Sequence, residues 1–301
     1  MKVYVFFAMT IPNPNFTLPC PAKLNLFLEV RGKRQDGFHE LGTLFQALDI
    51  GDTLSAEPWM VIDVVDDMNQ SIPLQENLIY KAAALLRTCY ANQVKQKGIR
   101  FHLNKKLPMG AGLGGGSSDA ATALLLANRV WNLNLSSGEL QLLAPMLGSD
   151  VAFFLQGPTT FAEGRGEKLT HAPSPYPFHV VVATPHCHVE TAWAYQQVKS
   201  PYGNEWPNFK ANYTQESANP LFYRDLTNDF ERFVVEKKPE ISEIREALAS
   251  FQPVKVMLTG SGSSLFALFL DESTAFECQA AISSQCRFSA VSHFLKPKNI
   301  F

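Results

Sequence analysis

A glycine-rich turn that leads directly into a helical run lies at the centre of this chain: "PMGAGLGGGSSDAATALLL", Pro108 to Leu126. Five of the seven residues from Gly110 to Gly116 are glycine. Glycine lets the backbone adopt positive φ angles and approach a ligand closely. The free N–H groups and the positive dipole end at the start of a helix form an anion site. The stretch therefore predicts a turn and helix that bind phosphate groups.

Other interpretations of this turn fit less well. A purely structural strand-to-helix connection does not need so many glycines. A P-loop ends in GK[ST], and no lysine follows Gly116. Residues 110–115 satisfy the G-x-G-x-x-G pattern of dinucleotide-binding folds, but "NKKLP" separates them from the preceding strand. The nearest later acid, Glu139, lies in a second helical pattern rather than at a strand end, which argues against that fold.

The composition is that of an ordinary globular protein. The chain has 301 residues, of which 46% are hydrophobic and 18% charged, with a formal net charge of -2. This length favours two domains. The charge gives no general attraction to polyanions, so nucleic acid is not an expected partner. No run approaches the roughly 18 apolar residues of a membrane span, so no membrane association is expected.

The cysteines and the amino terminus indicate a cytoplasmic protein. The five cysteines are scattered and lack CxxC spacing, which predicts neither a disulfide framework nor a zinc site. The first ten residues resemble a signal peptide only faintly, because the proline-rich "IPNPNFTLP" follows where a cleavage site would stand. Met9 is an alternative start to Met1.

The segments alternate between strand and helix patterns. "AKLNLFLEV" and "IRFHLNK" read as strands of one sheet. "ENLIYKAAALLRTCYANQ", "SSDAATALLLANRVW", "SSGELQLLAPML" and "DFERFVVEKKPEISEIREALAS" have helical spacing, and "VKVMLTGSGSSLFALFL" is strand-like. Residues 171–177 predict a connection between domains, and residues 200–220 predict a long polar loop. The order lacks strict βαβ alternation and favours an α+β fold.

Three motifs carry a family resemblance. "LPMGAGLGGGSSDAA" resembles the central motif of the GHMP kinases, whose glycine loop holds the phosphates of ATP. "PAKLNLFL" (Pro21 to Leu28) resembles their first motif, and "VMLTGSGSSLFALF" (Val256 to Phe269) resembles their third. The motifs occur in the order of that family and span nearly the whole chain. The resemblance implies a two-domain α+β kinase with its active site in the cleft between the domains.

Two longer segments narrow the resemblance. "PAKLNLFLEVRGKRQDGFHEL" and "GSDVAFFLQGPTTFAEGRGEKL" are similar to the GHMP kinases that phosphorylate a cytidine diphosphate-linked alcohol on the non-mevalonate route to isoprenoids. This implies phosphorylation of a 2-hydroxyl by ATP with Mg²⁺, in a monomer or weak homodimer. Residues 1–170 would form the ATP-binding domain and residues 171–301 the domain on the substrate side. The ligands of Mg²⁺ are not identified by the sequence.

Phosphoryl transfer needs positioning, neutralisation of charge and a group that accepts the hydroxyl proton. Asp150 in "LGSDVAFF" matches the catalytic base of the family, and Lys23 in "PAKLN" matches its active-site lysine. Without the resemblance, Asp150 would be read as a turn or cap residue and Lys23 as a solvated strand position. The family commonly has proline where Ala152 stands, so the backbone after Asp150 is less constrained here.

The resemblance assigns further residues to the substrate. In "DGFH", Phe38 would stack on the cytosine and His39 would bind its polar edge, although the family more often has tyrosine at the first position. Tyr195 would cover the other face, and Asn25 would lie near the reacting end of the substrate. The backbone of Gly260, Ser261 and Gly262 would face the diphosphate; the alternative for this segment is a simple hairpin turn.

The ATP side is assigned in the same way. Ser117 and Ser118 would cap the helix and offer hydroxyls to phosphate or Mg²⁺, with Asp119 in its first turn. Asn77 would also serve as a helix cap. The expected ATP-binding residues are Asn77, Lys105, Pro108, Gly110, Ala111, Gly112, Leu113, Gly114, Gly115, Gly116, Ser117 and Ser118.

Two other functions remain open at this point, besides the dinucleotide-binding oxidoreductase that the glycine pattern favours least. One is a GHMP kinase with a different small alcohol, such as mevalonate or homoserine, against which "DGFH" argues. The other is a binding or regulatory protein that keeps the fold without catalysis, against which the presence of both Lys23 and Asp150 argues.

Overall fold

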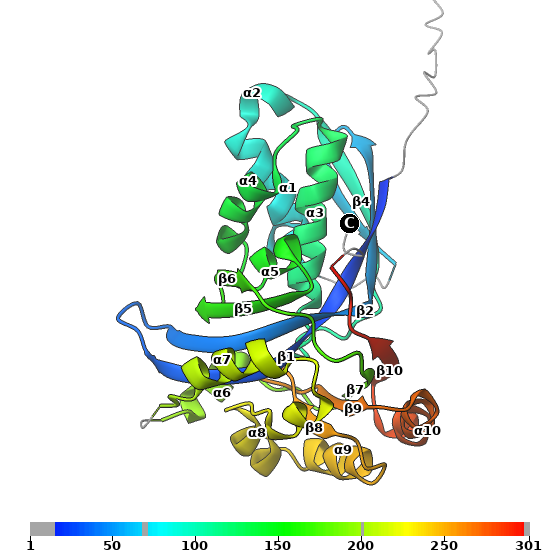
Figure 1. Ribbon diagram of the computed structural model, residues 1–301. Coiled ribbons are helices and arrows are strands. Elements are labelled where there is room, and N and C mark those ends of the chain that lie inside the picture. Colours follow the sequence, from blue (N-terminus) through cyan, green and yellow to red (C-terminus); the bar gives the residue numbers. More distant parts are fainter. Residues whose placement is uncertain (1–15, 68–71, 200–201, 298–301) are drawn as a thin grey trace, which may run out of the picture.

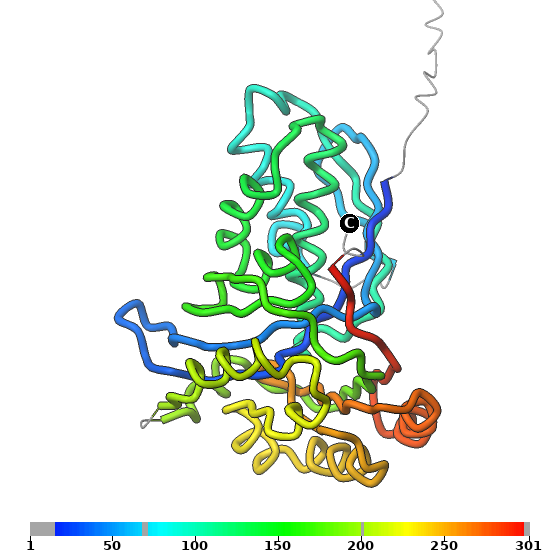
Figure 2. The backbone as a smooth tube through the Cα atoms, in the orientation of Figure 1, coloured from blue at the N-terminus to red at the C-terminus, as the bar shows by residue number. Residues whose placement is uncertain are grey.

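The computed structural model describes residues 16–67, 72–199 and 202–297, and the inferences about the first residues lie outside this part. Two bodies of strands and helices lie one above the other in Figure 1, with the long strands β1 and β2 running between them. The chain trace in Figure 2 places the first half of the sequence above and most of the second half below. This confirms the expected α+β architecture.

The upper body is built on a six-stranded sheet. Its order is β3-β4-β2-β5-β6, and β1 also pairs with β2. All pairs are antiparallel except β3 with β4. The strands are β1 (Phe16–Lys33), β2 (His39–Trp59), β3 (Ile62–Asp66), β4 (Gly98–Asn104), β5 (Thr159–Gly164) and β6 (Lys168–His171).

Five helices pack with this sheet, as Figure 1 shows. Their alanine and leucine side chains join Phe101, Leu54 and Phe45 of the strands in one apolar core. The helices are α1 (Leu78–Cys89), α2 (Ala91–Val94), α3 (Gly115–Val130), α4 (Ser137–Leu143) and α5 (Val151–Gln156).

The lower body is built on a four-stranded antiparallel sheet of order β10-β7-β9-β8. Its strands are β7 (His179–Thr184), β8 (Lys255–Leu258), β9 (Leu265–Phe269) and β10 (Phe288–His293). The accompanying helices are α6 (Thr191–Gln197), α7 (Trp206–Glu216), α8 (Glu231–Lys237), α9 (Pro239–Ala249) and α10 (Glu272–Ile282). Short 3₁₀ turns occupy Leu74–Glu76, Ala144–Met146, Pro220–Asp225 and Ser283–Gln285. Among the described residues, no helix is both long and apolar enough to cross a bilayer.

The sequence patterns gave most elements correctly. The two predicted strands lie in β1 and β4, and both pair with β2 in one sheet. The helical patterns form α1 and α2, α3, α4, and α8 with α9, the last two separated at Lys238 before Pro239. "VKVMLTGSGSSLFALFL" forms the hairpin of β8 and β9.

The polar loop predicted for residues 200–220 is wrong, because α7 lies within it. Trp206, Phe209 and Tyr213 recur at helical spacing, and two of them are fully buried. Their rings stack on one another and on Phe27 of β1. Because polar residues separate these aromatic positions, the segment was read as a polar loop. Burial of the three aromatic side chains against β1 stabilises the helix.

The predicted start of α3 also needs correction. Gly114, with a φ of 73°, is the N-cap residue and makes no side-chain capping bond, so neither Ser117 nor Ser118 caps the helix. Asp119 lies beyond the first turn. The left-handed conformation of Gly114 starts the helix three residues earlier than the serines suggest.

The two bodies share apolar contacts. Leu26 and Phe27 of β1 lie in one cluster with Phe178, Val180 and other residues of the lower body. The sheets change between β6, which ends at His171, and β7, which begins at His179. The predicted domain boundary between residues 170 and 171 lies close to this passage from one sheet to the other, and it stays a prediction.

Candidate active site

Two cavities lie on the two sides of the glycine loop. The larger, of about 1020 Å³, is lined by residues of β1, β2, α6, the start of α5 and the β8–β9 turn. The smaller, of about 300 Å³, is lined by the start of α1, the end of β4 and the loop into α3. Gly110, Gly112 and Gly114 line both cavities. The loop is thus a thin wall from which backbone groups can reach either side.

The glycine loop requires its glycines for two reasons. Gly110, Gly112 and Gly114 have φ angles of 61°, 82° and 73°, which side chains of L-residues rarely permit. A Cβ atom on Gly112 would overlap the carbonyl oxygen of Thr259, and one on Gly114 would lie 2.8 Å from Cγ of Lys23. The loop therefore packs directly against the β8–β9 turn and against the β1 lysine.

Lys23 and Asp150 meet in the larger cavity. On β1, Lys23 and Asn25 alternate with Ala22, Leu24 and Leu26, whose side chains are in the apolar core. The Nζ atom of Lys23 lies 3.7 Å from Oδ2 of Asp150. It also donates a hydrogen bond of 2.7 Å to Oδ1 of Asn25. Alternation along a strand therefore brings a cation to the cavity from an otherwise buried segment.

The electrostatics of Lys23 are set by burial. Its side chain is only 5% exposed, and removal from water lowers the pKa of its ammonium group, while the charge of Asp150 opposes that shift. The ring of Phe45 lies 5.3 Å from the ammonium. A lysine in this position can interact strongly with an anion that enters the cavity, because little water competes.

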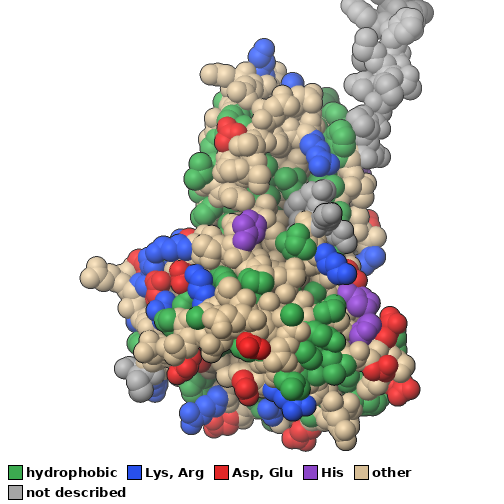
Figure 3. Space-filling view, in the orientation of Figure 1, with side chains coloured by type: hydrophobic (Ala, Val, Ile, Leu, Met, Phe, Trp, Pro, Cys, Tyr) green, Lys and Arg blue, Asp and Glu red, His purple; other side chains and the backbone are tan. Residues whose placement is uncertain are grey.

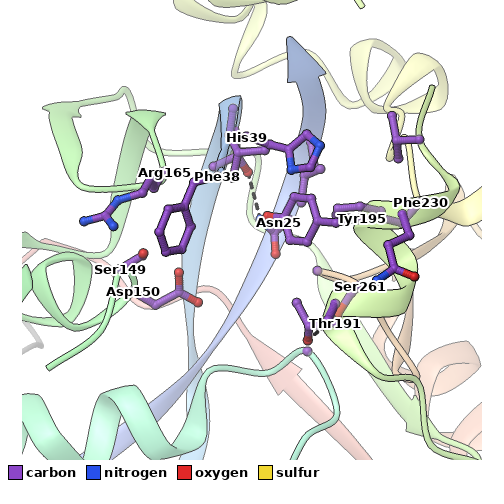
Figure 4. Close-up of a pocket in the computed structure, with 18 of the residues that line it drawn as sticks. Asn25, Phe38, His39, Ser149, Asp150, Arg165, Thr191, Tyr195, Phe230 and Ser261 are labelled. Atoms are coloured by element: carbon purple, nitrogen blue, oxygen red, sulfur yellow. Dashed lines mark hydrogen bonds between the residues drawn. The ribbon is translucent and has the colours of Figure 1, made fainter. Parts of the chain in front are cut away.

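Asp150 precedes α5 as its N-cap residue but makes no side-chain capping bond. The side chain is 31% exposed, and Figure 4 shows it pointing into the cavity beside Ser149. Its carboxylate is therefore available both to Lys23 and to a ligand. The alternative interpretation of Asp150 as a helix-capping side chain does not fit this geometry.

Aromatic side chains form another part of the larger cavity. The rings of His39 and Tyr195 stack with centroids 5.0 Å apart. Phe38 is 53% exposed, and the guanidinium of Arg165 lies 4.6 Å from the centre of its ring. Figure 4 shows Phe38 and Arg165 on the Asp150 side and Tyr195 across from them. Tyr195 thus stacks on His39 and lies across the cavity from Phe38, and its role on the second face of the cytosine stays a prediction.

A buried ion cluster supports the smaller cavity. The ammonium of Lys105 donates to Oδ2 of both Asp52 and Asp119, and burial of Asp119 raises the pKa of that carboxyl to about 7. Oδ1 of Asp52 accepts hydrogen bonds from the backbone N–H groups of Lys106 and Leu107, at 2.6 and 2.8 Å. Asp52 thereby fixes the segment that enters the glycine loop.

A buried carboxylate oxygen of Asp119, near the start of α3, fits a hard cation such as Mg²⁺. Oγ of Ser118 and Oδ1 of Asp119 have no hydrogen-bond partner among the described residues. Asp119 lines the smaller cavity. Mg²⁺ prefers oxygen ligands and is commonly held by one or two carboxylates together with substrate phosphates.

The structure brings nearly all predicted site residues to these cavities. Around the larger cavity lie Lys23, Asn25, Phe38, His39, Asp150, Tyr195, Gly260 and Ser261. Around the smaller lie Asn77, Lys105, Pro108, Gly110, Ala111, Gly112, Leu113, Gly114, Gly115, Gly116 and Ser117. Gly262 and Ser118 line neither. Asn77 does cap α1, since its Oδ1 accepts from the N–H of Ile79.

Some residues at the site escaped the sequence analysis. Thr259 Oγ1 accepts from the backbone N–H of Asn25 at 3.0 Å, and Thr43 Oγ1 accepts from its side-chain amide at 2.8 Å. Arg165 and Thr191 line the larger cavity. Thr259 and Arg165 lie inside motifs that resemble those of the family, and this position could have marked them as site residues. Nothing in the sequence distinguishes Thr43 or Thr191 from ordinary strand and helix residues.

Family models match both halves of the chain. The model described as "GHMP kinases N terminal domain" matches residues 77–158, and "GHMP kinases C terminal" matches residues 213–287. The first match contains the glycine loop and Asp150, and the second contains the β8–β9 turn.

Curated relatives cover most of the chain. The 4-diphosphocytidyl-2-C-methyl-D-erythritol kinase of Mannheimia succiniciproducens is 41% identical over 268 residues, which are 87% of this chain and 82% of that protein. The protein of the same name from Pasteurella multocida is 40% identical over 267 residues, 86% of this chain and 83% of that protein.

Solved structures agree with the sequence relatives. A crystal structure of 4-(cytidine 5'-diphospho)-2C-methyl-D-erythritol kinase has a TM-score of 0.79 and 32% identity, covering 93% of this chain and 100% of the other. Homoserine kinase from Cytophaga hutchinsonii, at 16% identity and a TM-score of 0.73, covers 98% of each chain and shares the fold. The chain therefore belongs to the GHMP kinases and, among them, to the family of 4-diphosphocytidyl-2-C-methyl-D-erythritol kinases.

Proposed function

We propose that this protein transfers the γ-phosphoryl group of ATP to the 2-hydroxyl of 4-diphosphocytidyl-2-C-methyl-D-erythritol, with Asp150 as the base and Lys23 as the stabiliser of charge. The relatives carry the name of this substrate. The main structural support is that Gly110, Gly112 and Gly114 line both cavities, and that the Lys23–Asp150 pair lies in the larger one. A nucleotide in the smaller cavity could thus present its terminal phosphate to an alcohol in the larger one.

The transfer step needs one proton acceptor. As the hydroxyl oxygen forms its bond to the γ-phosphorus, its O–H bond breaks and the proton passes to the carboxylate of Asp150. The bond between the γ-phosphorus and the bridging oxygen breaks, and ADP leaves. Asp150 suits this role because its side chain reaches the cavity and makes no capping bond.

Lys23 would stabilise the negative charge that spreads over the transferred group. Its ammonium is buried and is oriented by Asn25, whose own amide is held by Thr43. A preorganised cation in a site with little water stabilises a transition state without reorienting during the reaction. Asn25 would thus act both on Lys23 and on the reacting end of the substrate.

The ATP phosphates would lie along the loop and the start of α3. Two of the three ammonium hydrogens of Lys105 are used by Asp52 and Asp119, which leaves one for a phosphate oxygen. Mg²⁺ would be held by Asp119, with Ser118 close by. When bound, the ion neutralises part of the phosphate charge.

The cytidine end of the substrate would bind among Phe38, His39 and Tyr195. The stacked pair of His39 and Tyr195 and the ring of Phe38 offer flat faces, and the imidazole offers a polar edge. Stacking of a base on an aromatic ring contributes about 1–3 kcal/mol. The backbone of Gly260 and Ser261 would face the diphosphate from the β8–β9 turn.

The proposal is tested by incubating the protein with ATP, Mg²⁺ and the diphosphocytidyl alcohol and following the reaction by ³¹P NMR. We expect one new phosphomonoester signal for each ADP formed. Mevalonate and homoserine serve as matched alcohols and should give no phosphomonoester. Phosphorylation of either in place of the cytidyl alcohol, or release of inorganic phosphate alone, would refute the proposed substrate.

A further inference from the structure

A second cluster of chemically active side chains lies away from both cavities. His179 begins β7 and His293 ends β10, and the two are direct partners across the antiparallel pair. Nδ1 of His179 lies 3.1 Å from Nε2 of His293. Oε1 of Glu272, the first residue of α10, lies 4.0 Å from the same Nε2 atom. None of these three residues lines either cavity.

The fold explains why the three side chains meet. Alternation along the strands places His179 with Val181, and His293 with Val291, on one face of the lower sheet. Val181 and Val291 pack in the same cluster as Ala275 of α10, so this helix covers that face. Its first turn then brings Glu272 over the histidine pair. Figure 3 shows histidine side chains beside acidic ones near the right edge of this face.

A fourth residue orients one of the histidines. Nδ1 of His293 lies 3.1 Å from Oδ2 of Asp49, on β2 of the upper sheet. A carboxylate accepts hydrogen bonds, so Nδ1 of His293 carries the proton and Nε2 presents a lone pair. Carboxylate–histidine contacts of this kind fix the tautomer of metal-binding histidines and raise the basicity of the free nitrogen.

The separation of the two histidine nitrogens suits a tetrahedral metal ion, and the exposed Glu272 carboxylate, 4.0 Å from Nε2 of His293, must move closer to join them. Two nitrogens at the zinc–nitrogen distance of about 2.0–2.1 Å lie about 3.3 Å apart in tetrahedral geometry. The two histidine nitrogens are 3.1 Å apart, and each residue offers a ligand atom within 4.8 Å of the others. Two imidazoles and a carboxylate favour zinc, whereas Mg²⁺ and Ca²⁺ prefer oxygen ligands alone.

We propose that His179, His293 and Glu272 bind a Zn²⁺ ion, with Asp49 holding His293 in the required tautomer and water as the fourth ligand. Without the ion, the Nδ1–H group of His179 donates to Nε2 of His293. Binding replaces this hydrogen bond, and the proton of His179 moves from Nδ1 to Nε2, so both lone pairs face the metal. No change in total protonation of the neutral pair is needed.

Such an ion would tie the two bodies of the protein together. Oδ1 of Asp49 accepts from the backbone N–H of His293 at 2.8 Å and from Oγ of Ser292 at 2.6 Å. Leu48 forms an isolated β-bridge with Phe294. The ion would therefore connect β7, β10 and α10 and, through Asp49, reinforce the contact of β10 with β2. The expected role is structural rather than catalytic.

Zinc binding is measured by equilibrium dialysis with elemental analysis, in a Cys89→Ser background that removes an exposed thiol. We expect one Zn²⁺ per chain and a higher midpoint of thermal unfolding when the site is filled. His179→Gln and Glu272→Gln should each weaken binding at least tenfold. His102→Gln is the matched control, since His102 is an exposed histidine with Nε2 3.3 Å from a carboxylate oxygen of Glu57; it should bind zinc like the parent.

Substitution by Co²⁺ supplies a second readout. Four-coordinate Co²⁺ should give visible absorption in the parent and in His102→Gln but not in His179→Gln. Glu272 is largely exposed, so Glu272→Gln tests the site even if His179→Gln fails to fold. Absence of zinc binding, or binding that both substitutions leave unchanged, would overturn the proposal. Kinase activity is measured alongside and should not depend on zinc, which separates this test from that of the proposed function.

Discussion

The Nζ atom of Lys23 lies 3.7 Å from Oδ2 of Asp150, although the two residues are far apart in sequence. Lys23 lies on β1, where the residues on either side of it in sequence are also buried. Asp150 is the residue directly before the short helix α5. The partial burial of the pair makes their charges mutually dependent. Loss of either member therefore affects both charge and position at the proposed reacting centre.

Replacement of Asp150 by asparagine removes the proton acceptor but keeps nearly the same shape. We expect kcat to fall by about 10²–10⁴-fold, because general base catalysis is lost, while the KM for the cytidyl alcohol changes little. Steady-state kinetics at saturating ATP measures both. Asp63→Asn, which changes a carboxylate on β3 paired with Arg100, is the control and should keep the parent rate. Parent turnover in Asp150→Asn would refute the assignment of the base.

The pH dependence of the reaction tests Lys23. Burial lowers the pKa of its ammonium from the ordinary value of 10.5, and the charged form is the useful one. Activity should therefore decline with rising pH before an ordinary lysine would lose its proton. Lys23→Arg keeps its charge throughout this range, so it should be slower because of its different shape but lose the alkaline decline. Lys168→Arg, at an exposed position on β6, should retain that decline. An unchanged profile in Lys23→Arg would exclude this lysine as its origin.

The helices α3 and α7 differ in how much of each could be predicted from the sequence. The glycine-rich segment and the helical run that follows were sufficient to predict the turn and helix, and three of its five glycines, Gly110, Gly112 and Gly114, do adopt positive φ angles. The first residue of α3 was missed, since serines are good caps and the left-handed Gly114 took that place instead. The α7 helix was missed because only three aromatic positions mark its buried face, and their partners on β1 are distant in sequence.

Some residues of the candidate site could also be predicted from the sequence, and others could not. Residues inside motifs, such as Lys23 and Asp150, could be predicted because the resemblance supplied their roles. Asp52 and Thr43 could not be predicted, since an aspartate and a threonine in a strand have no distinctive local pattern. Their roles appear only when β2 is placed beside β1 and β4. Thr43 then accepts a hydrogen bond from Asn25, and Asp52 accepts one from Lys105.

Phe38→Ala tests the predicted binding site for the base. The ring of Phe38 is half exposed and contacts Arg165, so its loss should cost little stability. We expect the KM for the cytidyl alcohol to rise by about 5–150-fold, from the roughly 1–3 kcal/mol of one stacking contact, with kcat and the KM for ATP nearly unchanged.

The control for this substitution is Trp59→Ala. Trp59 is an exposed aromatic at the end of β2 that stacks on the guanidinium of Arg100, and it lines neither cavity. It should leave the KM for the cytidyl alcohol unchanged. If Phe38→Ala also leaves it unchanged, Phe38 does not belong to the base-binding site.

Two glycines, one in the loop and one in α4, give opposite expectations for the same change. Gly112→Ala would force a Cβ atom onto the carbonyl oxygen of Thr259 at a φ of 82°, so the loop must move away from the β8–β9 turn. We expect a lower thermal unfolding midpoint and at least a tenfold higher KM for ATP, based on the roughly 1.4 kcal/mol that one decade represents. Gly138→Ala, in α4 and outside both cavities, would bring its Cβ atom only to within 4.0 Å of Oγ of Ser136 and should resemble the parent. Similar ATP kinetics in both variants would contradict the phosphate-binding role of the loop.

The stability of the protein should carry a pH dependence that originates at Asp119. Burial raises the pKa of this carboxyl from 3.8 to about 7 in the folded state. Between those values the folded protein holds a proton that the unfolded chain has lost, so the free energy of unfolding falls as the pH rises across this window. Asp119→Asn cannot titrate and leaves Lys105 paired with Asp52, so the variant should gain stability relative to the parent from pH 4 to 7. Urea unfolding at a series of pH values measures this difference, and Asp63→Asn, at a partly exposed carboxylate, should follow the parent curve. Parallel curves for Asp119→Asn and the parent would place the titration elsewhere.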